Sequence, residues 1–448
     1  MLRLIVTDLV ASTRIWLGAL VVIVAAAFVA TVAVSFIATG LASGGQAREA
    51  LSSLGGVVIG FSAIAAIVVL TSVANLTIAL QQRSYALWQL VGLRPALVGW
   101  VVLGQLSIVS VLGASIGCLI ALPLLPAVFH ALFSSWAEVW RLVSGTPAQV
   151  NDVALILVIA GTAVVVLLGG LRGALRASRV PPIEALREPD PPRVRAGWLR
   201  WAVAVVTGGL VTAMALGLRG ASFSTISSQA VMLIPFLSAP LAALGPLLFP
   251  LVLRAWTALL PRRVSPSWFL ARHSARYRLS QSSAAIAPLM VAITLAGGLY
   301  TAMQLLTAAG EARGITGDFT IPVQAAVVVL GGPLLLSGLG AAATVFMAGR
   351  AREREFALIQ SAGGTTATIV VMAVWEAVIY ATTAVIFAGV AILTGGAFLA
   401  GVLEVPLTVA VMPCLVVTAG GFLLLLASTV IPTLVAVHRD IPRTLAVE

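Results

Sequence analysis

The stretch REREFALIQSAGGTTATIV, residues 352–370, opens with four charged residues in a chain of which only 9% of the residues are charged. The stretch QQRSYALWQLVGLRPALV, residues 81–98, has the same order of a basic residue, a short apolar segment and a glycine. Long apolar runs flank both stretches. We therefore interpret them as equivalent parts of an internal duplication. The residues that coincide on alignment are Arg83 with Arg354, Tyr85 with Phe356, Ala86 with Ala357, Leu87 with Leu358, Gln89 with Gln360 and Gly92 with Gly363.

The composition indicates an integral membrane protein. Hydrophobic residues make up 60% of the 448 residues and the mean hydropathy is +1.11, whereas soluble domains have about 45–50% apolar residues. Runs of about 20 apolar residues or more recur, and a helix of that length crosses a bilayer with its backbone satisfied. The predicted fold class is therefore an all-α integral membrane protein with about ten transmembrane helices. The predicted spans are 15–41, 54–80, 97–126, 151–171, 201–219, 229–254, 284–306, 322–348, 367–400 and 409–436.

The distribution of arginine predicts the orientation. All 26 basic residues are arginine, and an even number of spans places both termini on one side of the membrane. If that side is the cytoplasm, only Arg48, Arg141, Arg219 and Arg313 lie outside, as the positive-inside rule favours. The net charge of +11 is thus explained by topology, and no nucleic-acid partner is expected. The use of arginine alone, with much Ala, Val and Gly, suggests a bacterial protein. The expected location is therefore the bacterial plasma membrane, and the positive-inside rule predicts that the N- and C-termini are cytoplasmic.

The duplication predicts three parts. A second similarity relates RASRVPPIEALRE, residues 176–188, to HRDIPRTLAVE, residues 438–448, after the fourth and tenth spans. We therefore divide the chain into a first four-span unit (1–190), a two-helix linker (191–262) and a second four-span unit (263–448). Both units start on the same side, so the repeat is parallel rather than inverted. The charged loops of the two units are residues 81–96 and 349–366.

Each charged loop is predicted to form a short amphipathic helix that ends at a glycine. Such a helix suits docking into the groove of a partner, or else lies on the membrane surface. The apolar face would consist of Tyr85, Leu87, Trp88 and Val91 in the first copy and Phe356, Leu358, Ile359 and Ala362 in the second.

Three polar residues within spans are candidate functional residues. Glu376 is the only acidic residue in the interior of a predicted span, since Asp152 lies at the start of the fourth, and the duplication aligns Glu376 with Gln105. An ionisable residue in lipid is a functional candidate, although a structural or gating hydrogen bond is the alternative to substrate or proton work. Asn75 would be either a partner of Glu376 or a separate helix–helix bond. The long third and ninth spans would be tilted or broken near Pro123 and Gly395–Gly396.

The main predicted outer segment is FHALFSSWAEVWRLVSG, residues 129–145. Its apolar residues recur at helical spacing, which predicts a helix in the outer membrane interface. Aromatic residues there either anchor the protein in the interface or contact an amphiphilic substrate. The candidates for substrate contact are Phe133, Trp136 and Trp140.

The sequence contains no recognisable catalytic or metal-binding constellation. A P-loop requires a lysine that reaches the phosphates, and the chain has none. The three histidines are far apart, and the two cysteines lie in apolar runs. We therefore expect no enzyme activity, no metal site and no cofactor bound by this chain.

The motifs resemble the FtsX-like permease family of ABC transporters, which includes MacB-type and BceB-type permeases. The family's charged start, followed by Ala-Leu and a glycine, appears as REFALIQSAGG at 354–364. PIEALR at 182–187 is similar to the segment that closes such units, and Glu376 matches an acidic residue typical of the next span. The resemblance covers both four-span units.

The resemblance implies a permease that recruits a cytoplasmic ABC ATPase in two copies, with ATP and Mg²⁺ bound by that partner. The loop between the second and third span of each unit would be the coupling helix that receives the motion of the ATPase. The first copy has Ser84 where the second has Glu355, so the two docking sites would differ in strength. The residues assigned to coupling are Arg83, Tyr85, Leu87, Trp88, Gly92, Arg352, Glu353, Arg354, Glu355, Phe356, Leu358 and Gly363.

The implied substrate is amphiphilic: an antimicrobial peptide, a lipid or a hydrophobic drug that is exported or extracted from the membrane. The alternative is an ATPase-driven transducer that transports nothing and regulates a partner enzyme or sensor kinase. A third class is a proton-driven secondary transporter. The outer loops 42–53 and 307–321 are too short to hold the large external domains of MacB-type and BceB-type permeases, so no specific substrate is carried over.

Overall fold

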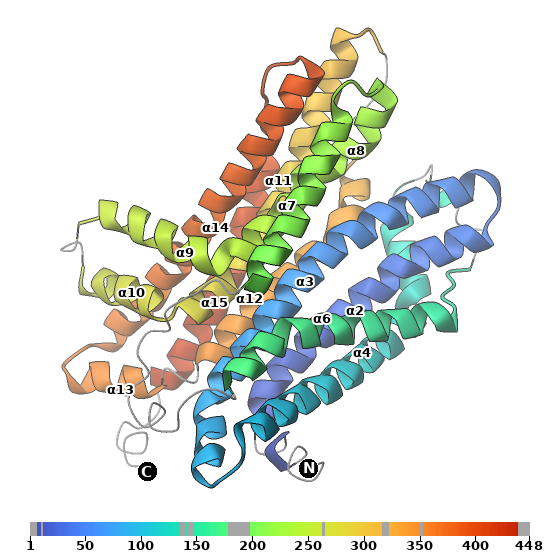
Figure 1. Ribbon diagram of the computed structural model, residues 1–448. Helices are drawn as coiled ribbons and strands as arrows, with labels where there is room; N and C mark the ends of the chain where they lie inside the picture. The colour runs from blue at the N-terminus through green and yellow to red at the C-terminus, as the bar shows by residue number, and fades with distance from the viewer. Residues whose placement is uncertain are drawn as a thin grey trace.

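The computed structural model describes residues 7–9, 12–134, 136, 139–141, 147–177, 198–261, 265–315, 322–349 and 353–437. Every regular element within these ranges is a helix (Figure 1). The helices are α2 (Thr13–Ala42), α3 (Gly45–Leu90), α4 (Pro95–Phe133), α6 (Asp152–Ala177), α7 (Trp198–Leu218), α8 (Phe223–Phe236), α9 (Ser238–Leu259), α10 (Pro266–Tyr277), α11 (Leu279–Ala312), α12 (Val323–Gly349), α13 (Glu353–Ser361), α14 (Thr366–Leu403) and α15 (Val411–Val437).

Ten helical segments of the described chain are long and apolar enough to cross a membrane. This confirms the predicted all-α, multi-span fold. The long helices run between two ends of the molecule (Figure 1). We call the end where α3 stops and α13 lies the motif end, and the end where α7 turns into α8 the far end.

The helix starts follow from local sequence. The N–H of Trp268 donates to the Ser265 hydroxyl at the start of α10 (3.0 Å), and the N–H of Thr368 donates to the Thr365 hydroxyl at the start of α14 (3.2 Å). Both contacts satisfy an amide that has no partner within its helix. Pro95 occupies the first turn of α4, where its missing N–H has no cost.

The predicted breaks in the third and ninth spans are wrong. The helix α4 continues through Pro123, and α14 continues through Gly395–Gly396. Gly395 instead allows close packing, because a Cβ there would lie 2.7 Å from Cδ1 of Leu237. The break between α8 and α9 occurs at Leu237, two residues after Pro235. A proline lacks the amide that a continuous helix requires.

The core of the molecule surrounds α11. Every residue from 284 to 299 is buried, and α11 contacts α3, α8, α9, α10, α12, α14 and α15. Through its contacts with α3 and α12 it joins the two halves of the chain. The outermost helices expose apolar side chains, such as Val206 on α7 and Val416 on α15, as surfaces in contact with lipid do. Figure 1 shows α9 and α10 beside the bundle, lying across the direction of the long helices.

We predict that Gly117→Ala destabilises the protein by about 1–3 kcal/mol, because overpacking a tight contact forces neighbouring atoms to shift. A Cβ at Gly117 of α4 would lie 2.5 Å from the carbonyl oxygen of Val24 in α2. Thermal unfolding in detergent measures the effect. The matched control is Gly161→Ala on α6, where a Cβ meets nothing within 4 Å. Equal melting temperatures for the two variants would contradict close α2–α4 packing.

Candidate functional site

The two aligned stretches end in the same backbone structure. Gly92 has φ of 98° and Gly363 has φ of 91°, a left-handed conformation that glycine adopts without steric cost. Each glycine closes its helix with the hydrogen-bond pair of a Schellman motif, which confirms the predicted helix ends. The bonds in the first copy are Gly92 N–H to Gln89 O (3.1 Å) and Leu93 N–H to Trp88 O (3.1 Å); those in the second copy are Gly363 N–H to Gln360 O (3.0 Å) and Gly364 N–H to Ile359 O (2.8 Å).

The helices that carry these ends differ between the copies. In the second copy α13 is a separate short helix, as predicted. In the first copy the prediction of a separate helix is wrong, since α3 continues from Gly45 to Leu90. The residues that follow its apolar run include Ala, Leu, Gln and Arg, which are good helix formers. The second copy has Gly349 at this place, where α12 ends.

The apolar face predicted for each motif is divided between two environments. Tyr85 has no exposed surface and Phe356 is 4% exposed, so both point into the bundle. Leu87 and Leu358 are 46% and 54% exposed and point outward. Trp88 is half-buried and packs edge-on against Tyr85, with ring centroids 5.4 Å apart. One aromatic residue therefore anchors each motif, whereas Leu87, Leu90 and Val91 of the first copy and Leu358 of the second are presented at the surface.

The charged residues of the motifs are placed only in part. Arg83 lies in α3, and Glu353, Arg354 and Glu355 lie in α13, but their side chains are outside the described part of the structure. Arg352 is outside the described residues. Their role in coupling therefore remains a prediction from the sequence.

A buried polar cluster holds the first motif in place. The Tyr85 hydroxyl donates to the side-chain oxygens of Gln81 and Gln105, the latter at 3.3 Å. The Gln105 amide donates to Oδ2 of Asp8 (2.8 Å), and the Gln81 amide to Oγ of Ser12 (3.3 Å). Gln105 has no exposed surface. The cluster thus joins the end of α3 to α4 and to the segment that precedes α2.

The electrostatics of the cluster follow from its burial. Burial raises the pKa of the Asp8 carboxyl, and the hydrogen bond from Gln105 offsets part of this rise. Burial and the nearby charge of Asp8 raise the pKa of Tyr85, so its hydroxyl keeps the proton that it donates. The sequence alone did not identify Asp8, Gln81 and Ser12 as members of this polar cluster. The one available signal was that Asp8 is the only acidic residue before Glu49.

The second motif has a different pair of buried residues at the equivalent positions. Phe356 replaces Tyr85, and Glu376, with no exposed surface, replaces Gln105. The neighbouring Trp375 packs edge-on against Trp268 of α10, with ring centroids 5.1 Å apart. The structure therefore places Glu376 and Gln105 at equivalent depths in α14 and α4, each beside a different set of neighbours.

Asn75 forms a separate helix–helix bond. Its amide donates to the carbonyl oxygens of Thr71 in its own helix (2.7 Å) and Gly169 in α6 (3.0 Å). Of the two predicted alternatives, this geometry supports the bond between helices rather than a pair with Glu376.

Phe133, one of the three candidates for either substrate contact or anchoring in the interface, is completely buried. It packs edge-on against Phe36 and Phe129 at the end of α4, with centroids 5.5 and 5.6 Å away. The substrate contact predicted for it is therefore wrong. Trp136 and Trp140 are half-buried, and Trp140 packs against His130 at 5.2 Å.

The described residues contain no group of three His, Cys, Asp or Glu side chains that could hold a metal ion. Cys118 is buried and Cys414 half-buried, and both are free thiols. The notable chemistry of the described part of the chain is therefore in the two motifs and their anchors.

Comparison with known proteins identifies one family. A model of the FtsX-like permease C-terminal family matches residues 56–182 and 327–441, together more than half of the chain. The two matches begin at positions separated by the same interval as Arg83 and Arg354. Each contains one copy of the charged motif and ends after α6 or α15. No curated protein and no solved structure matches the chain.

We predict that Tyr85→Phe destabilises the protein by about 1–3 kcal/mol, because it deprives the buried oxygens of Gln81 and Gln105 of their shared donor. Thermal unfolding in detergent measures the loss. Tyr300→Phe is the matched control, since the Tyr300 hydroxyl has no hydrogen-bond partner among the described residues. The cluster would have no anchoring role if both variants melted like the unchanged protein.

The raised pKa of the Asp8 carboxyl predicts that the stability of the protein depends on pH. A carboxyl whose pKa is higher in the folded than in the unfolded state favours folding below the unfolded value, near 3.8, and loses this contribution as pH rises through the raised pKa. Asp8→Asn keeps an oxygen that accepts from Gln105 but does not ionise. Its melting temperature relative to the unchanged protein should therefore rise between pH 4 and pH 8. Glu49→Gln, which removes an exposed carboxylate, should show no such trend.

Proposed function

Because this chain belongs to the FtsX-like permease family of ABC transporter-type membrane permeases, we propose that it is the transmembrane subunit on which a separate cytoplasmic ATPase dimer acts. In this proposal the permease couples ATP hydrolysis to the export or membrane extraction of an amphiphilic molecule. Antimicrobial peptides, lipids and hydrophobic drugs belong to this substrate class.

The observation that carries the proposal is the pair of equivalent tips at the motif end. Each tip has a Schellman cap and an exposed leucine, Leu87 or Leu358, and both tips lie at the same end of the bundle (Figure 1). A helix end with an exposed apolar residue and charged neighbours suits a groove in a partner protein. Two such tips in one chain support two ATPase subunits per permease.

The length of α3 also supports docking outside the membrane. Its 46 residues extend about 69 Å, whereas a bilayer with its headgroups is about 40–45 Å thick. The candidate membrane span within α3 ends at Gln82, which supports a first tip that lies beyond the lipid. The arginine distribution supports placing this end in the cytoplasm, where the ATPase partner would be.

The two tips would transmit motion differently. The first tip is the end of a continuous helix that spans the bundle, so a push on Leu87 displaces α3 as a lever. The second tip, α13, is a separate helix in contact with α14 and α15. A push on Leu358 reaches the bundle through these two helices.

ATP and Mg²⁺ would be bound by the partner subunit, which supplies the hydrolysis. The contribution of this chain is mechanical. The tips receive displacement, and their buried anchors, Tyr85 with Gln105 and Phe356 beside α14, pass it to the spans.

Co-purification with the partner ABC ATPase tests the proposal, with native mass spectrometry to count subunits. We expect two ATPase subunits per permease. Joint substitution of Arg352→Glu and Arg354→Glu should lower ATPase recovery about tenfold or more, since charge reversal across an interface costs binding free energy. Arg48→Glu, at the far end, is the charge-matched control and should change nothing.

Separate substitutions resolve the two tips. Leu87→Asp and Leu358→Asp each place a charge on one exposed tip, and each should leave a complex with a single ATPase subunit. Recovery of two subunits from both variants and from the double arginine variant would contradict docking at the tips. Transport of a labelled amphiphile in proteoliposomes then separates a permease from a transducer that moves nothing.

A further inference from the structure

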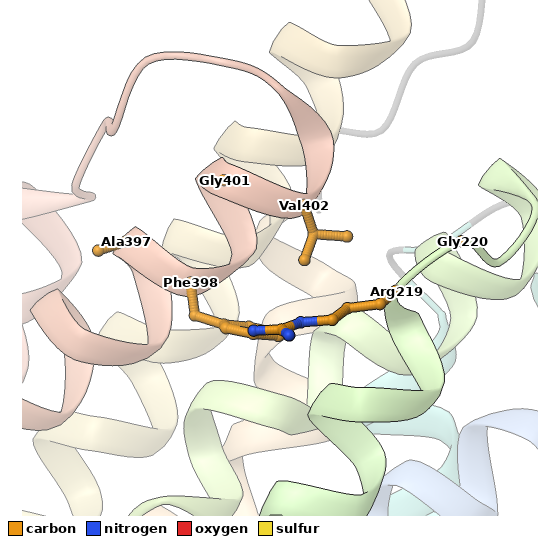
Figure 2. Close-up of a pocket in the computed structure, with 6 residues that line it drawn as sticks. All are labelled: Arg219, Gly220, Ala397, Phe398, Gly401 and Val402. Carbon is orange, nitrogen blue, oxygen red and sulfur yellow. The ribbon is translucent and has the colours of Figure 1, made fainter.

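The far end of the molecule contains an open recess between the α7–α8 turn and α14. It has a volume of about 410 Å³ and is lined by Arg219 and Gly220 from the turn and by Ala397, Phe398, Gly401 and Val402 from α14. Figure 2 shows the Arg219 side chain reaching across from the turn to the Phe398 ring, with Val402 pointing toward them. The recess therefore combines one cation with a wall of apolar and small residues.

Arg219 has hydrogen-bond donors available for a ligand. Its guanidinium carbon lies 5.7 Å from the centroid of the Phe398 ring, and within the described part of the chain it has no carboxylate partner. Arg313, at the same end, is used differently. It donates to the carbonyl oxygens of Ala309 and Leu403, each at 3.2 Å. Arg313 thus ties helix ends together, whereas Arg219 presents a planar cation to the recess.

An exposed apolar stripe leads from the recess along α14. Leu393 and Val390 lie about one and two turns before Ala397 in the sequence, on the face of α14 that also carries Gly401. Both are about half exposed. The helix α7, which precedes Arg219, also exposes apolar side chains, among them Leu216 and Leu210. In a bilayer this stripe contacts acyl chains, and Arg219, directly after the last residue of α7, lies at the level of the headgroups.

We infer that the recess binds the phosphate group of an anionic lipid, with the Arg219 guanidinium on the phosphate and an acyl chain along the α14 stripe. Arginine matches phosphate geometry through two parallel N–H donors. The cation–π contact of Arg219 with the Phe398 ring restricts the guanidinium before the ligand arrives. The site does not rest on the proposed function, because it lies at the end opposite the tips and requires no ATPase.

Lipid retention by the purified full-length protein tests the inference. The protein is exchanged into detergent containing phosphatidylglycerol, and native mass spectrometry counts bound lipid. Arg219→Gln should lower retention about tenfold, as expected for loss of a charge-assisted pair. Gly401→Leu keeps the charge and should lower retention similarly, because a Cβ at Gly401 meets nothing within 4 Å and a leucine there fills the recess. Arg48→Gln removes another exposed outer arginine and should leave retention unchanged.

Two further compounds, tested in the same retention assay, identify the chemical group that the recess binds. Diacylglycerol, which lacks the phosphate, should not be retained above the level of Arg219→Gln. Inorganic phosphate should not displace phosphatidylglycerol, since it makes no contact with the α14 stripe. Equal retention by the unchanged protein, Arg219→Gln and Gly401→Leu would overturn the inference. Displacement of the lipid by inorganic phosphate would overturn the assignment of a lipid in favour of a free anion.

Discussion

The burial of the central part of α11, residues 284–299, is the constraint on which the rest of the structure depends. Each of the helices from α2 to α15 named above contacts either α11 itself or a helix that is packed against α11. Helices in lipid gain little from the hydrophobic effect when they associate, so they rely on close packing of small residues. Gly298 shows how close this packing is, because a Cβ there would lie 2.8 Å from the Ile234 side chain. Both halves and the linker are thus placed relative to each other by one helix.

This common scaffold makes the difference between the two motifs meaningful. Their backbone caps are the same, but their anchors use different interactions. The Tyr85 cluster consists of directional hydrogen bonds in a buried site, where each lost partner leaves an unsatisfied polar group. In the second motif the anchoring residue is Phe356, whose buried ring cannot donate a hydrogen bond as the Tyr85 hydroxyl does. The anchor of the first tip is therefore held by directional hydrogen bonds, whereas the anchor of the second tip packs through an apolar ring.

The sequence predicts those features of this fold that depend on local composition. The spans follow from long apolar runs, and the helix ends at Gly92 and Gly363 follow from glycine's access to positive φ. Tertiary features are different. The bend falls at Leu237 rather than at Pro123, because neighbouring helices decide which proline is accommodated. Phe133 is buried because α2 supplies Phe36 opposite it, which no spacing in α4 reveals.

The same limit applies to the candidate site. The alignment of Gln105 with Glu376 marked both positions, but it could not show that Asp8 reaches Gln105 from a segment 97 residues away. The recess at Arg219 likewise joins parts of the chain that no local motif connects. In the sequence, Arg219 is one of four arginines on the predicted outer side, and only the fold distinguishes it from Arg313.

The unbroken course of α14 connects the two ends of the molecule. Its 38 residues extend about 57 Å, with Trp375 and Glu376 near the motif end and Phe398 and Gly401 near the far end. The chain reverses direction before Thr366 and after Leu403, not within the helix. A displacement of its motif end by α13 therefore moves the wall of the recess. Because coupling between two binding sites is reciprocal, a ligand in the recess that favours one position of α14 would favour the matching position of the second tip by the same factor.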